Sequence, residues 1–211
     1  MFGTLFVEIF QEEKRLEISY MKDNRKELRK SKIQARNSLS PEERERLSAI
    51  ISDRIASSEI FKNAETVLIY RATKGEVRLD ALEKADEAAG KRLVYPLCIS
   101  DSEMISLLPE DENAWKSGYF GIMEPVREKS AEIPPEEIDL VICPCTAFDE
   151  DCGRMGMGAG FYDRYLAKCV NAHIAAVAFE VQKADSIPME PWDKPMEMVF
   201  TEAGTYYKKH D

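Results

Sequence analysis

The strongest constraint on the fold is an apolar run, Ile138–Ile142, followed closely by a glycine-rich segment, Gly153–Arg164. A short run of this kind, interrupted only by Asp139, is typical of a strand buried on both faces of a parallel sheet. Four of the ten glycines in the chain lie in the segment, ahead of a helix-like stretch at 161–170. Because ligands of open α/β sheets bind beyond the carboxyl ends of the strands, this junction predicts both a fold class and a site.

Short β-rich runs alternate with helix-like stretches along the rest of the chain. Ser40-Pro41-Glu42-Glu43 indicates an N-cap, a proline at the first helical position and a capping glutamate at the third. Gly90 is a natural helix end. The alternation predicts an α/β fold, a three-layer α/β/α sandwich with a largely parallel, Rossmann-like sheet and an N-terminal helical arm. We expect strands at 66–70, 92–95, 104–108, 138–142, 174–179 and 198–201, and helices at 22–37, 41–57, 79–89 and 161–170.

Charge and cysteine content exclude several classes of protein. The chain of 211 residues carries 29 basic and 39 acidic residues, a net charge of −10, which disfavours nucleic acid and membranes as partners. Its five cysteines follow no disulfide framework, and a metal cluster at Cys143, Cys145 and Cys152 would lack a CxxC pair or a partner histidine. No apolar stretch reaches the roughly 18 residues of a membrane span, and Met1–Tyr20 is a poor signal peptide. A cytoplasmic location is therefore expected.

The glycine-rich segment is the first candidate site. Its glycines allow the backbone to approach an oxyanion, the following helix start adds partial positive charge, and Arg154 offers a fork for phosphate oxygens. The spacing of Gly156, Gly158 and Gly160 is G-x-G-x-G, which matches neither the dinucleotide fingerprint nor the P-loop. On spacing alone, a phosphate site is favoured over a glycine-rich surface turn.

Two charged segments are further candidates. Glu190 or Asp193, in a proline-rich loop at 188–195, could hold Mg²⁺ together with nucleotide phosphates, although a rigid solvated turn explains the loop equally well. Arg25 and Arg29 share one face of a basic helix at 22–36. A solvated face is the usual explanation for such a cluster, but in an acidic protein it also fits a nucleotide-binding arm.

Aromatic residues in the loop at 119–125 could stack on a flat heterocycle, although most such residues cap a core. His173 and His210 are the only histidines, and neither is well placed for a serine or cysteine nucleophile. The chemistry is therefore expected to depend on positioning and phosphate activation.

Together these segments resemble the 5-formyltetrahydrofolate cyclo-ligase family from about residue 22 to 203. The most specific match is the motif G-R-x-G-x-G-x-G-[FY]-Y-D-R at Gly153–Arg164. The other matches are Arg25–Arg29 with Leu39-Ser40, Lys74–Val77, Phe120–Pro125, Glu190–Asp193 and Val199–Glu202. The resemblance implies a single domain at 21–211, with residues 1–20 as an extension, and a monomer. The chain departs from the family pattern at Met157, Ala159, Phe161 and Trp192.

The family's activity would be the ATP-dependent closure of 5-formyltetrahydrofolate to 5,10-methenyltetrahydrofolate, through a phosphorylated formyl group. The resemblance implies catalytic roles for Arg154 and Tyr162, and Mg²⁺ held by Asp163 and Asp193. The implied ATP contacts are Arg25, Lys26, Glu27, Leu28, Arg29, Arg154, Met155, Gly156, Met157, Gly158, Ala159, Gly160, Phe161 and Tyr162. The implied folate contacts are Glu76, Phe120, Met157, Gly158, Ala159, Gly160 and Phe161.

Two other functions remain open at this point. One is an α/β enzyme that acts on a sugar phosphate or a CoA ester, which would share the glycine loop but would turn over without ATP. The other is a folate- or nucleotide-binding protein with little turnover, which the departures in the loop would favour.

Overall fold

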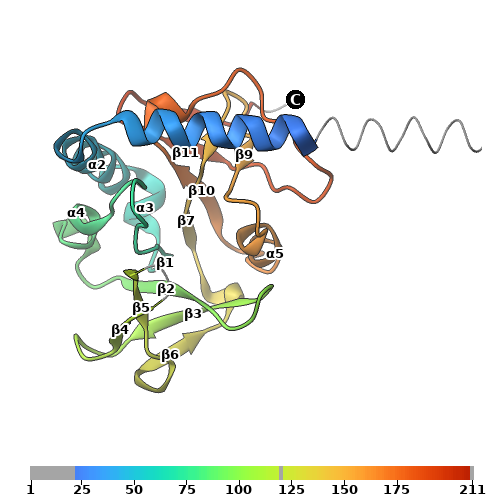
Figure 1. Ribbon diagram of the computed structural model, residues 1–211. Helices are drawn as coiled ribbons and strands as arrows, with labels where there is room; N and C mark the ends of the chain where they lie inside the picture. The colour runs from blue at the N-terminus through green and yellow to red at the C-terminus, as the bar shows by residue number, and fades with distance from the viewer. Residues whose placement is uncertain (1–21, 119–120, 210–211) are drawn as a thin grey trace, which may run out of the picture.

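The computed structural model describes residues 22–118 and 121–209, and an eight-stranded sheet forms its centre (Figure 1). The strand order is β12-β11-β10-β7-β1-β2-β3-β6. The stretch from β11 to β2 is parallel, whereas β12 at one end and β3 and β6 at the other pair antiparallel. The strands are β1 Thr66–Leu68, β2 Arg92–Cys98, β3 Met104–Pro109, β6 Ser130–Ile133, β7 Leu140–Pro144, β10 His173–Val177, β11 Met198–Phe200 and β12 Thr205–Tyr207.

Helices cover both faces of the sheet, as the three-layer prediction requires. Val67 and Ile69 face a core that includes α2, α3 and α4, whereas Leu68 and Val141 face a second core that includes α5. The alternation of neighbouring residues between the two cores is the period of two that a strand imposes. The α-helices are residues 22–38, α2 Pro41–Ala56, α3 Glu59–Asn63, α4 Asp80–Glu83 and α5 Phe161–Leu166. The short 3₁₀ turns are Asp86–Ala88, Arg127–Lys129, Pro135–Glu137 and Glu180–Gln182.

Local sequence explains where α2 and β7 begin. The Ser40 hydroxyl accepts a hydrogen bond from the Glu43 backbone N–H at 3.1 Å, with Pro41 at the first helical position, as predicted. The buried run predicted at 138–142 forms β7 two residues later, because Asp139 has another role. Its carboxylate accepts hydrogen bonds from the backbone N–H groups of Glu65 and Thr66, at 3.0 and 2.8 Å, and so fixes the start of β1.

Two helix predictions were wrong in length. The helix expected at 79–89 is α4 followed by a 3₁₀ turn, because Leu82 and Ala88 are both buried although they lie six residues apart. An unbroken helix would place them roughly 120° apart around its axis, so the two could not point in the same direction. The helix expected at 161–170 ends at Leu166, and the chain then tightens into bonds such as Lys168 N–H to Tyr165 O at 2.9 Å.

Two antiparallel hairpins that the sequence did not predict complete the region around the carboxyl ends of the parallel strands. They are β4 Trp115–Ser117 with β5 Met123–Pro125, and β8 Ala147–Phe148 with β9 Arg154–Met155. The N-terminal helix, blue in Figure 1, lies across this region close to β9. Leu28 anchors it against a small cluster around Ala147 and Met155. None of the helices in 22–118 or 121–209 is long and apolar enough to cross a membrane.

Candidate active site

A cavity of about 1100 Å³ opens at the carboxyl ends of the parallel strands. Its volume is slightly above the range of roughly 300–1,000 Å³ that is usual for small-molecule sites, which leaves room for two substrates. Although the chain has a net charge of −10, the described part of the wall carries more basic than acidic residues. The basic ones are Lys22, Arg25, Arg29, Arg71, Arg154, Arg164 and Lys194, and the acidic ones are Glu76, Glu124, Asp163, Glu190 and Asp193. The cavity therefore concentrates positive charge in an acidic protein, which favours an anionic ligand.

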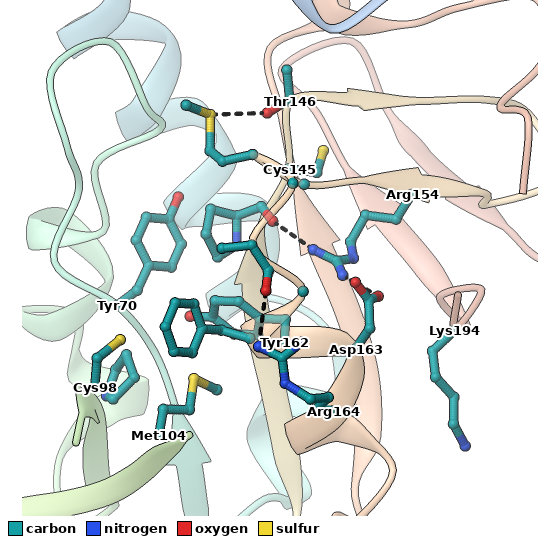
Figure 2. Close-up of a pocket in the computed structure, with 18 of the residues that line it drawn as sticks. Tyr70, Cys98, Met104, Cys145, Thr146, Arg154, Tyr162, Asp163, Arg164 and Lys194 are labelled. Carbon is teal, nitrogen blue, oxygen red and sulfur yellow. Dashed lines mark hydrogen bonds and ion pairs between the residues drawn. The ribbon is translucent and has the colours of Figure 1, made fainter. Parts of the chain in front are cut away.

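Arg154 lies on β9 with only 3% of its surface exposed. Its Nη2 donates to Asp163 Oδ1 at 2.6 Å and its Nη1 to the Pro144 carbonyl at 3.4 Å (Figure 2). The buried Nε has no hydrogen-bond partner among the described residues. Burial works to lower the pKa of Arg154, but Cys143 and Asp163 raise it overall, so the guanidinium stays charged. Only two of its five N–H donors are paired in this way, so an arginine on the cavity wall keeps donors for a ligand.

Tyr162 lies at the centre of the cavity in Figure 2, between Tyr70 on one side and Asp163 on the other. Its phenol oxygen is buried and no described residue is within hydrogen-bonding reach of it. Burial raises the pKa of Tyr162 well above its ordinary value, so the phenol stays protonated at neutral pH. A buried hydroxyl without a partner is costly, which indicates that a ligand completes its hydrogen bonding.

The loop from Gly156 to Gly160 lines the cavity in a conformation that depends on glycine. Gly158 and Gly160 have φ values of +108° and +70°, in the left-handed region that other residues rarely adopt. Arg29 Nε donates to the Gly156 carbonyl at 2.8 Å, and Arg164 Nη2 donates to the Ala159 carbonyl at 2.8 Å. The two arginines therefore fix the loop from its two ends, and both also line the cavity.

Arg25 and Asp193 form an ion pair at another part of the wall. Arg25 Nη1 lies 2.6 Å from Asp193 Oδ2 and 2.6 Å from the Pro188 carbonyl oxygen. Asp193 Oδ2 also accepts the Glu190 backbone N–H at 2.8 Å, and only 4% of its side chain is exposed. The basic helix and the proline-rich loop at 188–195, which the sequence analysis named as separate candidates, are thus in direct contact.

The donor set is compatible with magnesium bound together with phosphates. No group of three or more metal-ligating side chains occurs in the described part of the chain, which includes the region around Cys143 and Cys145. Asp163 and Asp193 both line the cavity with carboxylate oxygens, the ligands that Mg²⁺ prefers. Because Mg²⁺ is commonly held by one or two carboxylates and the phosphates of a substrate, these residues fit the ion without a complete protein cage.

The opposite wall is less charged. Tyr70, Cys98 and Met104 lie on that side in Figure 2, and the β5 segment of the hairpin lines it as well. Glu76 reaches the cavity from the loop after β1, where its Oε2 accepts the Thr73 backbone N–H at 2.8 Å. Phe120, the other residue predicted on this side, lies outside the described residues.

Some predicted contacts do not reach the cavity. Lys26 and Glu27 are exposed and are not part of its wall, while Leu28 packs against the cluster beneath the helix. Met155 is fully buried in that same cluster. The other candidates line the cavity: Arg25, Arg29, Glu76, Arg154, Gly156, Met157, Gly158, Ala159, Gly160, Phe161, Tyr162, Asp163 and Asp193.

The sequence did not single out two residues that support this arrangement. Asp149 is 7% exposed, and its carboxylate accepts the backbone N–H groups of Gly153 at 2.8 Å and Ile187 at 2.7 Å, tying the glycine-rich segment to the proline-rich loop. Arg71 lines the cavity and is held by Glu83 at 2.8 Å. An aspartate four residues before the first glycine, where its side chain can accept backbone N–H groups of a turn, was a readable signal for the first. The pairing of Arg71 depends on tertiary contacts and left no such signal.

Comparison with known proteins gives one consistent family. Residues 21–202 match the model of the 5-formyltetrahydrofolate cyclo-ligase family. The chain is similar to the 5-formyltetrahydrofolate cyclo-ligases of Haemophilus influenzae, 30% identical over 64% of this chain and 74% of that one, and of Mus musculus, 28% identical over 83% and 92%.

Solved structures agree with the sequence relatives. The 5,10-methenyltetrahydrofolate synthetase of Aquifex aeolicus matches with a TM-score of 0.77 and 32% identity, over 89% of this chain and 94% of that one. The synthetase of Mycoplasma pneumoniae matches with a TM-score of 0.69 and 27% identity, over 84% and 98%. With a matching family model over most of its length and the same fold as these synthetases, the chain belongs to the 5-formyltetrahydrofolate cyclo-ligase family.

Proposed function

We propose that this protein converts 5-formyltetrahydrofolate to 5,10-methenyltetrahydrofolate and consumes one ATP, with release of ADP and phosphate. Membership of the family supports the folate conversion. The observation that carries the ATP requirement is the positive wall of the cavity in an acidic chain, with the buried Arg154 Nε and Tyr162 hydroxyl both lacking partners among the described residues. These are the donors that a transferring phosphoryl group needs.

In the proposed reaction the formyl oxygen attacks the γ-phosphorus of ATP, the bond from phosphorus to the β,γ-bridging oxygen breaks, and ADP leaves. The product is an N5-iminium phosphate. N10 of the folate then attacks the activated carbon, loses its proton, and inorganic phosphate leaves with the former formyl oxygen. A formyl oxygen is a poor leaving group until it is phosphorylated, so the order of the two steps follows from the chemistry.

Positioning and electrostatics supply the catalysis in this scheme. Arg25, Arg29 and the backbone of the Gly156–Gly160 loop bind the phosphates. Arg154 stabilises the charge that spreads over the phosphoryl oxygens, because its guanidinium is already desolvated and held by Asp163. Tyr162 stays neutral and donates a hydrogen bond where the two substrates meet.

Magnesium is proposed to be held by Asp163 and Asp193 together with the phosphates, and when bound it offsets phosphate charge. Each carboxylate is paired with an arginine through one oxygen in this structure, Asp163 through Oδ1 and Asp193 through Oδ2, so the metal would take the other oxygen and leave the Arg154–Asp163 pair in place. Glu76 and Phe120 are proposed to contact the folate on the opposite wall. A cytoplasmic location and a monomeric state stay predictions.

The test is an assay that follows methenyl absorbance and ADP in one reaction with Mg·ATP and 5-formyltetrahydrofolate. We expect equal amounts of the two products and no turnover when ATP is omitted. Turnover of a sugar phosphate or CoA ester without ATP would favour the related α/β enzyme instead. Binding of both substrates with no product would favour a binding protein.

A further inference from the structure

Trp192 is a large aromatic side chain on the cavity wall with 67% of its surface exposed. Isolated exposed apolar residues are common on proteins, so exposure alone decides nothing. What distinguishes Trp192 is its position directly before Asp193, whose carboxylate holds Arg25 at 2.6 Å. The backbone that carries the indole is therefore held next to Arg25, at the wall of the cavity.

The turn that carries Trp192 is rigid. Pro191 precedes it, the Asp193 N–H donates to the Glu190 carbonyl at 2.9 Å, and the Glu190 N–H donates to Asp193 Oδ2 at 2.8 Å. Proline at the second position of a turn sets the backbone angle in advance. Arg25 then ties the closed turn to the N-terminal helix through Asp193 and the Pro188 carbonyl. An aromatic ring presented on such a turn loses little conformational entropy when a ligand stacks on it.

Contacts connect Arg154 to Trp192 along the charged wall. Gly156 lies beside the Arg154 guanidinium and its carbonyl accepts Arg29 Nε at 2.8 Å, while Arg25, one turn earlier on the same helix, pairs with Asp193, the neighbour of Trp192. The side chains of Arg154 and Arg25 are 2% and 12% exposed, whereas Trp192 as a residue is 67% exposed. A nucleoside triphosphate whose γ-phosphate lies at the buried Arg154 and whose other phosphates lie along Arg25 therefore directs its base toward the open end. Trp192 is an aromatic surface at that end, and every nucleobase has a flat face that can stack on it.

We propose that Trp192 is the stacking platform for the nucleotide base and that it determines the preference of the site for purine over pyrimidine nucleotides. The inference rests on the proposed use of ATP. It commits to a purine because the larger ring system covers more of the indole than a pyrimidine does, whereas the phosphate contacts are the same for all nucleotides.

The chain contains two tryptophans, which makes the proposal accessible to fluorescence. Trp115 does not line the cavity and packs edge-on against Tyr95, with ring centroids 4.7 Å apart. In a Trp115→Phe background, Trp192 is the only indole. We expect ATP and GTP to quench its emission in a saturable way, CTP to do so more weakly, and inorganic tripolyphosphate to bind competitively without quenching.

The matched binding experiment uses Trp192→Ala, Trp192→Phe and, as a control for loss of an exposed aromatic elsewhere, Tyr207→Ala. Tyr207 is 64% exposed on β12 and does not line the cavity. Trp192→Ala is expected to weaken ATP binding by about 5- to 150-fold, the effect of losing one base–aromatic stack. The affinities for tripolyphosphate and 5-formyltetrahydrofolate are expected to stay unchanged. Trp192→Phe should retain most of the ATP affinity, and Tyr207→Ala all of it.

The outcomes separate this inference from the proposed function. If Trp192→Ala binds ATP as well as the wild type, or loses tripolyphosphate affinity to the same extent, the stacking role is wrong while the use of ATP stands. Weaker folate binding with normal ATP binding would move Trp192 to the folate side and also overturn the proposal. If the wild-type protein binds no ATP, the proposed function and this inference fail together.

Discussion

Arg154 and Asp163 form an ion pair that contributes to stability and that we propose also serves the reaction. Their ion pair is 2.6 Å long and the Arg154 side chain is 2% exposed, so removing either charge would leave its partner desolvated and destabilise the fold. A test of function therefore needs a substitution that keeps the charge.

Arg154→Lys is that substitution. The ammonium retains the ion pair but loses the planar fork and the free Nε, so fewer donors reach the phosphoryl oxygens. We expect kcat to fall by about 10²- to 10³-fold, the usual cost of one preorganised donor, with folate affinity nearly unchanged. Steady-state kinetics and folate titration measure the two. An equal loss of both would mean that Arg154 only supports the fold.

The Arg25–Asp193 ion pair leads to a second prediction about single residues. In Asp193→Asn, Arg25 no longer has a carboxylate partner at 2.6 Å, so it is free for phosphate even without metal. We expect metal-free ATP to bind more tightly than to the wild type, and the tightening caused by Mg²⁺ to shrink by on the order of tenfold. Calorimetric titrations with and without Mg²⁺ measure both effects.

Glu190→Gln is the matched control for that experiment, because the Glu190 carboxylate is farther from Arg25, at 3.8 Å, and the proposed function assigns the metal to Asp163 and Asp193, although the sequence alone left Glu190 open. It should keep the full response to Mg²⁺. If Asp193→Asn also keeps it, Asp193 does not hold the metal.

At the scale of elements, the Gly156–Gly160 loop depends on backbone angles as much as on side chains. Gly158→Ala places a Cβ at φ +108° and 3.5 Å from Arg29 Cζ. Such a residue costs about 1–3 kcal/mol in strain, and the loop can lower that cost only by moving away from its cavity-lining conformation. We expect weaker ATP binding, measured by titration, together with a modest loss of stability.

Gly90→Ala is its control, because Gly90 also has a positive φ, +81°, and a Cβ there would have no neighbour within 4 Å. That variant should lose stability and keep its ATP affinity. Equal ATP binding in both variants would contradict a nucleotide role for the loop.

Whether a helix or strand could be predicted from the sequence depends on whether local residues alone determine it. Parallel strands and the capped start of α2 were readable because they follow from local apolar runs and one N-cap. The break after α4 was not, because it depends on burying both Leu82 and Ala88 against the rest of the core. Of the site, the glycine loop and its basic partners were predicted, whereas Met155 and Leu28 were predicted as contacts from the motif but pack into the core.

For the whole molecule, buried thiols link stability to alkaline pH. Burial raises the pKa of Cys143 from 9.0 to about 11 and that of Cys145 from 9.0 to about 12. The unfolded chain therefore releases these protons first, and the free energy of unfolding is expected to fall as the pH rises from about 9 towards 12, with no such loss below that window.

Urea unfolding at a series of pH values measures this slope, and Cys145→Ala should make it shallower. Burial also raises the pKa of Tyr70 and Tyr162, so part of the slope remains in the variant. A free energy of unfolding that stays constant above pH 9, or an identical slope in the variant, would contradict the expectation.

In the proposed reaction the formyl oxygen is phosphorylated before the ring closes. The most direct measurement uses 5-formyltetrahydrofolate labelled with ¹⁸O in the formyl group, followed by mass analysis of the phosphate that is released with Mg·ATP. We predict one ¹⁸O atom in each phosphate, because the C–O bond breaks after the P–O bond has formed. Unlabelled phosphate, with the ¹⁸O released into water, would contradict it.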